Sequence, residues 1–171
     1  MAGKQSGQDG PGLFDDFEAV GTFAAAAETA WANPPAQLVV RADGGSRGNP
    51  GPAAYGALVT DTAGVVLNQE GLSIGTATNN VAEYLGLIAG LEMARAINPA
   101  AEVDVRLDSK LVIEQMAGRW KVRHPDMKPL AVKATSLRPA KVTWTWVPRA
   151  ENKAADALVN SALDGMPVPR L

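Results

Sequence analysis

Four acidic residues stand where carboxylates could do chemistry: Asp43, Glu83, Asp108 and Asp156. Two of them end apolar, strand-like runs and two lie near the starts of predicted helices, places that tend to meet at one edge of a sheet. Each has an ordinary alternative, since Glu83 and Asp156 could favour helix N-termini, Asp108 could cap a helix, and Asp43 could belong to a turn. Together, the four would repel one another unless a cation lay among them.

The composition restricts which cation that could be. The chain has no cysteine, which excludes disulfides and thiolate metal sites. Oxygen atoms must therefore supply the ligands. Oxygen ligands suit hard divalent cations such as magnesium or manganese.

Short apolar runs bounded by turn residues predict the strands that would position these acids. We predict strands at residues 38–43, 55–61, 65–73, 102–108 and 141–147. The first three are joined by short turns, which favours an antiparallel meander. Gly44, Gly45 and Gly48 predict that the backbone turns sharply just past Asp43.

Helical spacing of apolar residues begins at Val81, after Thr78 or Asn79 as a cap, and ends near Asn98. Further helices are predicted at residues 109–117, 130–137 and 152–163. Three antiparallel strands followed by strand–helix alternation predict an α/β fold: a five-stranded mixed sheet, three strands antiparallel and then two parallel, flanked by helices. Glu83 and Asp156 would then lie in the first turns of their helices.

The 171 residues, 46% of them apolar, suit one globular domain. We interpret residues 1–36 as an acidic tail and linker in which residues 14–31 could form a short helix, residues 37–165 as the domain, and residues 166–171 as a C-terminal tail. No apolar run has the length of a membrane span, and the N-terminus lacks the order of a signal peptide. We therefore expect a cytoplasmic protein with no membrane partner. We also expect it to be a monomer.

The net charge of −2 hides a basic segment, residues 119–138. This segment holds six Lys and Arg residues against a single acid, Asp126, whereas acids dominate residues 1–36. Local positive charge around an aromatic residue, here Trp120, is typical of nucleic-acid contact. A solvated charged loop is the alternative explanation.

Four motifs, in order, carry a family resemblance. They are DGGSRGNPGPAAYG from Asp43, TNNVAEYLGLIAGLEMA from Thr78, LDSKLVIEQM from Leu107, and WTWV from Trp144 leading to ENKAADALVN. Their order and spacing resemble type 1 ribonuclease H, the enzyme that cuts the RNA strand of RNA–DNA hybrids, over about residues 38–164. Each motif alone is weak evidence, whereas four in the family's order make a chance match improbable.

The resemblance implies a mechanism. The family's catalytic acids fall on Asp43, Glu83, Asp108 and Asp156, which implies phosphodiester hydrolysis with two magnesium ions, or manganese as a substitute. Asp43, being central, would bridge both ions. The products would carry 5′-phosphate and 3′-hydroxyl ends.

The resemblance also implies where the substrate lies. The RNA strand would contact Gly44, Ser46, Gly48, Asn80 and Glu83, in part through its 2′-hydroxyls. The DNA side would contact Thr78, Asn79 and Asn49, although helix capping and turn formation are alternative roles for the two asparagines. The basic segment resembles a shortened form of the family's DNA-binding handle, which implies contacts from Trp120, Lys121 and Arg123.

The chain departs from well-studied bacterial members in the loop before the last helix. Those members carry a histidine there, whereas residues 147–152 contain none. Arg149 is the nearest substitute and could stabilise phosphate charge, but could not act as a base. The short loop resembles the compact branch of the family, found in archaea and some bacteria. The one histidine, His124, lies in the basic segment, where no catalytic role is expected.

Three functions remain open on the sequence. The first is a hybrid-specific endonuclease, and the second is a module that binds the hybrid or duplex RNA with weak or no catalysis. The third is a nuclease of the same fold with another substrate. The complete set of acids argues against the second, and the glycine-rich and TNN motifs argue against the third.

Overall fold

One mixed sheet forms the framework of the computed structural model, which describes residues 31–171. Its strands are β1 (Gln37–Ser46), β2 (Gly51–Thr60), β3 (Val66–Ala77), β4 (Glu102–Leu107) and β5 (Val142–Trp146). In the order β3-β2-β1-β4-β5, the first three are antiparallel neighbours, while β4 and β5 run parallel to β1. This confirms the predicted fold class.

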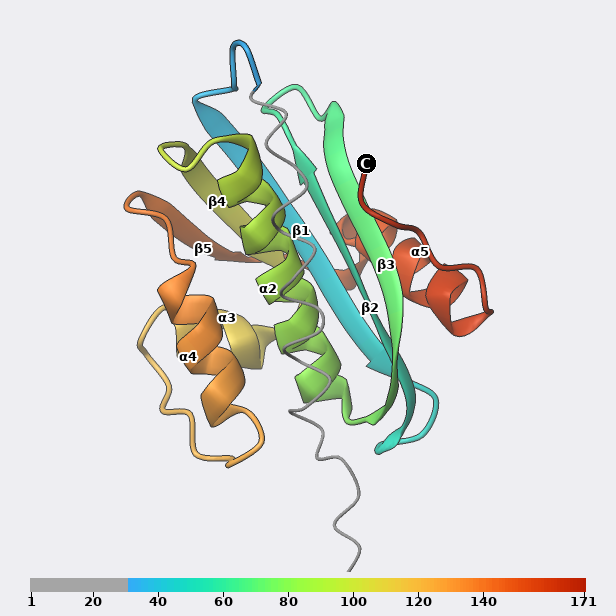
Figure 1. Cartoon of the computed structure of the whole chain (residues 1–171). Helices are drawn as coiled ribbons and strands as arrows, with labels where there is room; N and C mark the ends of the chain where they lie inside the picture. The colour runs from blue at the N-terminus through green and yellow to red at the C-terminus, as the bar shows by residue number, and fades with distance from the viewer. Residues whose placement is uncertain (1–30) are drawn as a thin grey trace, which may run out of the picture. The chain divides into compact units, whose positions relative to one another are not determined.

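Helices cover both faces of the sheet. One face carries α2 (Asn79–Ile97), α3 (Lys110–Met116) and α4 (Lys128–Ser136), and the other carries α5 (Lys153–Leu163) (Figure 1). The site residues therefore come from both layers and from the sheet between them.

β1 continues through Gly44 and Gly45, so the predicted sharp turn just past Asp43 was wrong. Gly44 pairs with Tyr55 of β2, and the chain turns only at residues 47–50, where Gly48 has a φ of +96°. Packing explains the glycine at position 44, because a Cβ there would lie 2.2 Å from the backbone of Ala82 in α2. Glycine is needed at this point for the close passage of a helix, not for a turn.

The neighbouring strands are also longer than predicted. β2 begins four residues before the predicted residue 55, and β3 extends to Ala77 rather than residue 73. Backbone hydrogen bonds hold these ends, with an irregularity in the pairing between Ala53 and Ala54. Because such bonds do not depend on alternating apolar side chains, the sequence pattern understates the strand lengths.

α2 is the central helix and lies across β1 (Figure 1). Thr78 is its N-cap, and its side chain accepts a hydrogen bond from the amide of Val81. The helix begins at Asn79, so Glu83 lies in the second turn and the first turn holds no acid. Both the predicted placement of Glu83 in the first turn and the helix-dipole alternative were wrong.

α3 begins at Lys110 with Ser109 as its N-cap, and the Ser109 side chain accepts from the amide of Val112. Ser109 thus takes the capping role considered for Asp108. α4 begins two residues earlier than predicted, with a proline in its first turn. On β5, Trp144 is half-buried, whereas Trp146 is 50% exposed.

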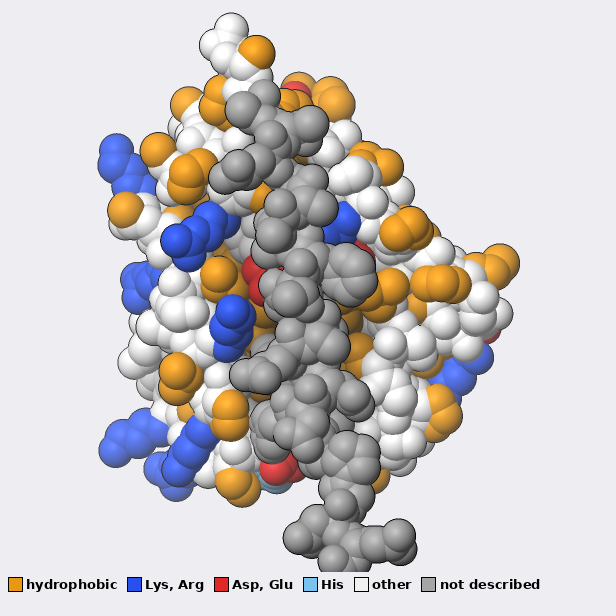
Figure 2. Space-filling view, in the orientation of Figure 1, with side chains coloured by type: hydrophobic (Ala, Val, Ile, Leu, Met, Phe, Trp, Pro, Cys, Tyr) orange, Lys and Arg blue, Asp and Glu red, His pale blue; other side chains and the backbone are white. Residues whose placement is uncertain are grey.

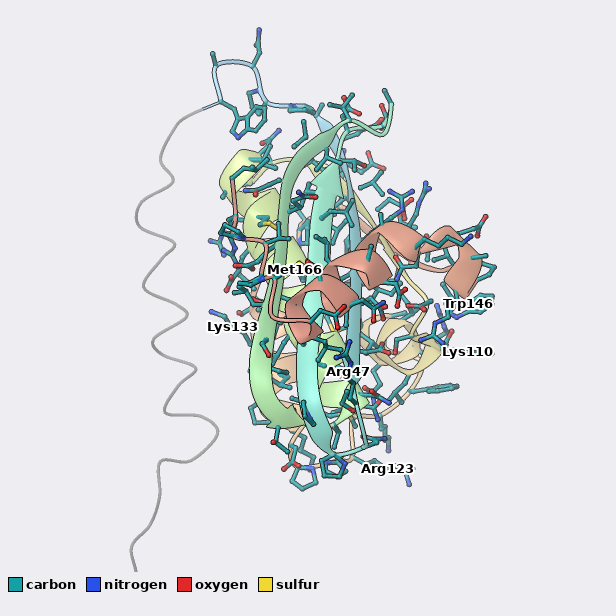
Figure 3. The ribbon with its side chains drawn as sticks, turned by 90° about the vertical axis from the view of Figure 1, so that its right-hand side faces the viewer. Arg47, Lys110, Arg123, Lys133, Trp146 and Met166 are labelled. Carbon is teal, nitrogen blue, oxygen red and sulfur yellow. The ribbon has the colours of Figure 1, made fainter. Side chains whose placement is uncertain are left out.

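α5 packs on β2, β3 and β1, and its apolar side chains Ala155 and Leu158 contact Leu58. A Cβ at Gly56 would lie 2.5 Å from the carbonyl oxygen of Ala155, so glycine permits this close contact. Figure 3 shows α5 lying across the strands. On this face of the sheet, α5 packs on β1, β2 and β3, whereas β4 and β5 lie to one side of the helix.

The C-terminal residues form part of the fold, which corrects the prediction of a tail at residues 166–171. Val168 pairs with Gly71 of the edge strand β3, and Arg170 bonds to Glu70 and Glu92. The helix predicted at residues 14–31 falls almost wholly outside the described residues. Within the described part of the chain, no helix is long and apolar enough to cross a membrane.

Candidate active site

Asp43 lies on β1 and is only 6% exposed. Its carboxylate accepts a hydrogen bond of 2.8 Å from the Gly44 amide. Burial raises the pKa of Asp43 to about 7, and repulsion from Asp108 and Asp156 adds to that shift. The three acids therefore share one electrostatic environment, as the sequence predicted.

Glu83 reaches the same environment from α2. Its position follows from the contact at Gly44, where the strand touches the helix backbone of Ala82 and Glu83. Burial raises the pKa of Glu83 to about 8, repulsion from Asp43 and Asp108 acts in the same direction, and a hydrogen bond from Ser109 opposes it. The structure thus brings together the four acids that the sequence selected.

Asn152 is a site residue that sequence reasoning missed. It is 1% exposed, and its Nδ2 donates to the backbone oxygen of Ala42 and to a carboxylate oxygen of Asp108, each at 2.9 Å. It therefore ties the start of α5 to β1 and holds Asp108. Asn152 is the N-cap residue of α5, yet its side chain makes no cap bond.

Asp108 has two further neighbours from the β5–α5 region. Trp146 donates from its indole nitrogen to the Asp108 backbone oxygen at 3.1 Å. The Arg149 guanidinium lies 4.0 Å from the Asp108 carboxylate, and its side chain is 83% exposed. Arg149 is thus placed beside the acids and free to turn toward a phosphate.

Asp156 lies in the first turn of α5, as predicted. One of its carboxylate oxygens accepts from the side chain of Asn160 at 3.2 Å. This bond fixes one oxygen of the Asp156 carboxylate against α5. The other carboxylate oxygen accepts no hydrogen bond from the described residues.

The chemistry of these side chains fits a hard cation. Oxygen atoms are the only strong metal-ligand atoms that the four acids offer. The raised pKa values of Asp43 and Glu83 mark a place where positive charge would relieve repulsion. Among residues 31–171, however, no group of three or more acidic or histidine side chains is already arranged around a common ion position. Asn152 and Arg149 draw Asp108 toward themselves, so a bound cation would have to compete with these partners.

The glycine-rich turn is tied to the start of α2 by the two asparagines. The Asn79 side-chain oxygen accepts from both the amide and the hydroxyl of Ser46, and the Asn49 side-chain oxygen accepts from the Asn79 amide. The helix-capping role considered for Asn79 was wrong, because Thr78 is the N-cap and the Asn79 oxygen instead bonds Ser46. The Asn49 oxygen bonds the first amide of α2, which links the turn to the helix. The amide NH2 groups of both asparagines donate no hydrogen bond to any described residue. Gly48 and Asn80 are exposed beside them.

The basic segment forms the loop that follows α3 and the helix α4, and Lys and Arg side chains gather on one side of the molecule (Figure 2). Trp120 is 47% exposed, and Lys121 and Arg123 are exposed as well. Arg119, by contrast, is paired with Glu114. His124 accepts a local turn hydrogen bond from the Asp126 amide through Nδ1.

Comparison with known proteins shows what the chain is similar to. Residues 41–162 match a family model described as reverse transcriptase-like. The chain is 55% identical over 131 residues to the bifunctional protein Rv2228c of Mycobacterium tuberculosis, covering 75% of this chain and 36% of that protein. It is 36% identical to ribonuclease H of Hydrogenovibrio crunogenus over 138 residues, 71% of this chain and 92% of the relative. The chain thus spans only about a third of the length of its mycobacterial relative.

Two solved structures are similar throughout the domain. The N-terminal ribonuclease H domain of the M. tuberculosis protein superimposes with a TM-score of 0.74 at 53% identity, covering 77% of this chain and 96% of that one. LC11-RNase H1, isolated from compost and solved in complex with an RNA/DNA hybrid, superimposes with a TM-score of 0.72 at 39% identity, covering 75% of this chain and 98% of that one.

Proposed function

This chain belongs to the ribonuclease H family, in its compact type 1 form, and on that premise we propose that it hydrolyses the RNA strand of RNA–DNA hybrids. The observation that carries the proposal is the meeting of Asp43, Glu83, Asp108 and Asp156 in one electrostatic environment. The hybrid bound by LC11-RNase H1 supports the choice of substrate.

We propose that the four acids hold two divalent cations, magnesium or manganese. Bound cations would supply a more acidic attacking water and neutralise charge on the leaving oxygen. Asp43, central among the acids, would contribute to both. Products would carry 5′-phosphate and 3′-hydroxyl ends.

The other residues orient the substrate and the acids. Asn152 holds Asp108 through its amide, and the exposed Arg149 is close enough to stabilise phosphate charge. Because arginine does not give up its proton near neutral pH, Arg149 would act as an electrostatic group rather than as a base.

Selection of RNA would come from the glycine-rich turn and the start of α2. Gly44, Ser46, Gly48, Asn80 and Glu83 would face the RNA strand, where 2′-hydroxyls distinguish it from DNA. The NH2 groups of Asn49 and Asn79, together with Thr78, would face the DNA side. Trp120, Lys121 and Arg123 would extend that contact along the DNA backbone.

A substrate panel tests the proposal. The full chain is incubated with end-labelled RNA–DNA hybrid, duplex RNA or duplex DNA, with magnesium or manganese and with EDTA as the control. Internal cuts in the RNA of the hybrid, dependent on the metal, are the expected result. Binding without cutting would indicate a binding module, and cutting of duplex DNA would indicate a different nuclease.

A further inference from the structure

Two arginines lie side by side on the sheet face next to α5. Arg41 of β1 is the register partner of Arg106 of β4. Arg106 uses its Nε to bond Asp104 at 2.7 Å, and Asp104 also accepts from Thr145 at 2.8 Å. No carboxylate among residues 31–171 lies within ion-pair distance of Arg41.

The arginines border a hollow in the protein surface. A space of about 530 Å³ is lined by Arg41, Arg106, Thr145, Trp146, Val147 and Glu151. A smaller hollow of about 120 Å³ adjoins both arginines on the β2 side, where Thr60 is 3% exposed and its hydroxyl has no partner among the described residues. The pair therefore lies in a groove between two hollows, one lined by Thr145 and the other by Thr60.

The groove lies next to the acids of the active site, toward the N-terminal ends of β1 and β4. Arg41 precedes Asp43 by two residues, and Arg106 precedes Asp108 by two. Alternate residues of a strand share a face and lie roughly 7 Å apart. Trp146 and Glu151, from the end of β5 and the following turn, also line the groove, and the Trp146 indole donates to the Asp108 backbone oxygen. The labelled Trp146 is visible beside α5 in Figure 3.

We propose that Arg41 and Arg106 form a binding site for a phosphate group, one strand step behind the catalytic acids. A guanidinium offers a planar fork of donors that matches phosphate oxygens, and Arg106 keeps its terminal NH2 groups free of Asp104. The charges that face Arg41 are Arg106, Asp104 and Glu151. Asp104 already accepts from Arg106 and Thr145. Asp61, which lines the smaller hollow, accepts from the amides of Ala63 and Val65. Glu151 is therefore the carboxylate that competes most directly with the ligand.

The phosphate could come from two sources. One is a nucleic-acid strand that continues past the active site, and this source rests on the proposed function. The other is a free phosphate or mononucleotide. Both present the same tetrahedral oxyanion, so the site is tested first with inorganic phosphate.

The experiment uses the full chain in EDTA, so that its result does not depend on cleavage. Inorganic phosphate is titrated at constant ionic strength while the Nε–H signals of the arginines are followed by NMR. We expect saturable shifts at Arg41 and Arg106. In Arg41→Gln, phosphate should bind at least about tenfold more weakly, the loss expected for one charge-assisted hydrogen bond.

Matched variants exclude loss of folding and nonspecific charge effects. Arg41→Lys keeps the charge but not the fork and should bind with intermediate affinity, whereas Glu151→Gln should bind more tightly. Arg95→Gln removes an exposed arginine of α2 and should change nothing. Equal shifts at all exposed arginines, or unchanged binding in Arg41→Gln with a native spectrum, would overturn the proposal.

Competition then identifies the source. An RNA oligomer with hydroxyl ends contains only phosphodiesters, and its competition with phosphate would assign the site to a strand. Competition by a 5′-mononucleotide alone would assign it to a free ligand. Both outcomes support the site, and they remain distinct from a failure of the hybrid-cleavage assay.

Discussion

Asp43 is held where its own charge is unfavourable. It is almost fully buried, receives one amide hydrogen bond and faces the carboxylates of Asp108 and Asp156. Such a group lowers the stability of the metal-free protein whenever it is ionised. A proton or a cation relieves the same repulsion, which links folding, pH and metal binding at one residue.

Replacing Asp43 with Asn should therefore have opposite effects on activity and on stability. We expect Asp43→Asn to abolish hybrid cleavage, because one bridging charge is lost, and to leave hybrid binding nearly intact. In EDTA the midpoint of thermal unfolding should rise by about 3 to 6 °C, since repulsion is removed. Calorimetry measures the midpoint of unfolding and the cleavage assay measures activity, with the exposed Asp126→Asn as the control. Retained cleavage would contradict the assignment of Asp43 as a metal ligand.

Stability without metal should fall as the pH rises. The pKa values of Asp43 and Glu83 are raised in the folded protein to about 7 and about 8, from ordinary values of 3.8 and 4.5. Below about pH 3 both groups are protonated in either state, whereas between about pH 4 and pH 8 the unfolded chain ionises first and is favoured. We expect the free energy of unfolding in EDTA to decline across this window and to level off above it. Saturating magnesium should flatten the decline, and a rise of stability with pH would refute the coupling.

At the scale of elements, the basic segment is anchored to the core. The Tyr84 hydroxyl of α2 donates to the Gln115 side chain at 2.6 Å, and Gln115 in turn donates to the backbone oxygen of Lys121 at 3.3 Å. The side chains of Tyr84 and Gln115 are both buried. The exposed charges after α3 are thus held at a set place relative to the helix that carries Glu83.

The basic segment should govern affinity rather than chemistry. If Lys121 and Arg123 neutralise phosphates, replacing both with Ala should raise KM and leave kcat nearly unchanged, because neither residue reaches the acids. The dependence of log affinity on log salt should flatten by up to about 2, through loss of counterion release. KM measured at several salt concentrations decides this, with Arg95→Ala plus Lys141→Ala, two exposed cations outside the segment, as the charge-matched control. Parallel salt slopes would remove the segment from the binding surface.

Gly44 is the point at which β1 and α2 touch. In Gly44→Ala the new Cβ would meet helix backbone at 2.2 Å, so the elements must separate, and we expect a loss of about 3 kcal/mol in the free energy of unfolding. The displacement should also lower kcat, since it moves Glu83 away from Asp43. At Gly45 the nearest atom to a new Cβ is a Val159 methyl at 3.4 Å, and Gly45→Ala is the matched control. Equal denaturation midpoints for the two variants would contradict this account.

At the scale of the whole molecule, the C-terminal residues join the sheet to the opposite helix layer. Arg170 bonds Glu70 of β3 at 3.0 Å and Glu92 of α2 at 2.8 Å, and the Tyr55 hydroxyl donates to Glu70. Glu70 is only 6% exposed. The last residues therefore neutralise acids on two elements that are distant in sequence.

Removing Arg170 should destabilise the fold without touching catalysis. Arg170→Ala leaves buried Glu70 without its cation, and we expect a loss of about 3 kcal/mol at pH 7. Adding Glu70→Gln should restore part of that loss, because the uncompensated charge is then absent. Urea unfolding measures both, and Arg138→Ala, at an exposed position, serves as the control. A stability unchanged in Arg170→Ala would show that the C-terminal residues do not hold the fold.

The sequence by itself determined the α/β class, the order of strands and helices, and the four acids, because hydrophobic periodicity and motif spacing are local properties of the chain. It did not reveal that Gly44 serves a helix crossing, that Glu83 lies in a second helical turn, or that Asn152 holds Asp108. Nor did it reveal that Arg41 is the register partner of Arg106, or that Arg170 forms an ion pair with Glu70. Each of these depends on which atoms meet across elements far apart in sequence, and only tertiary packing decides such contacts.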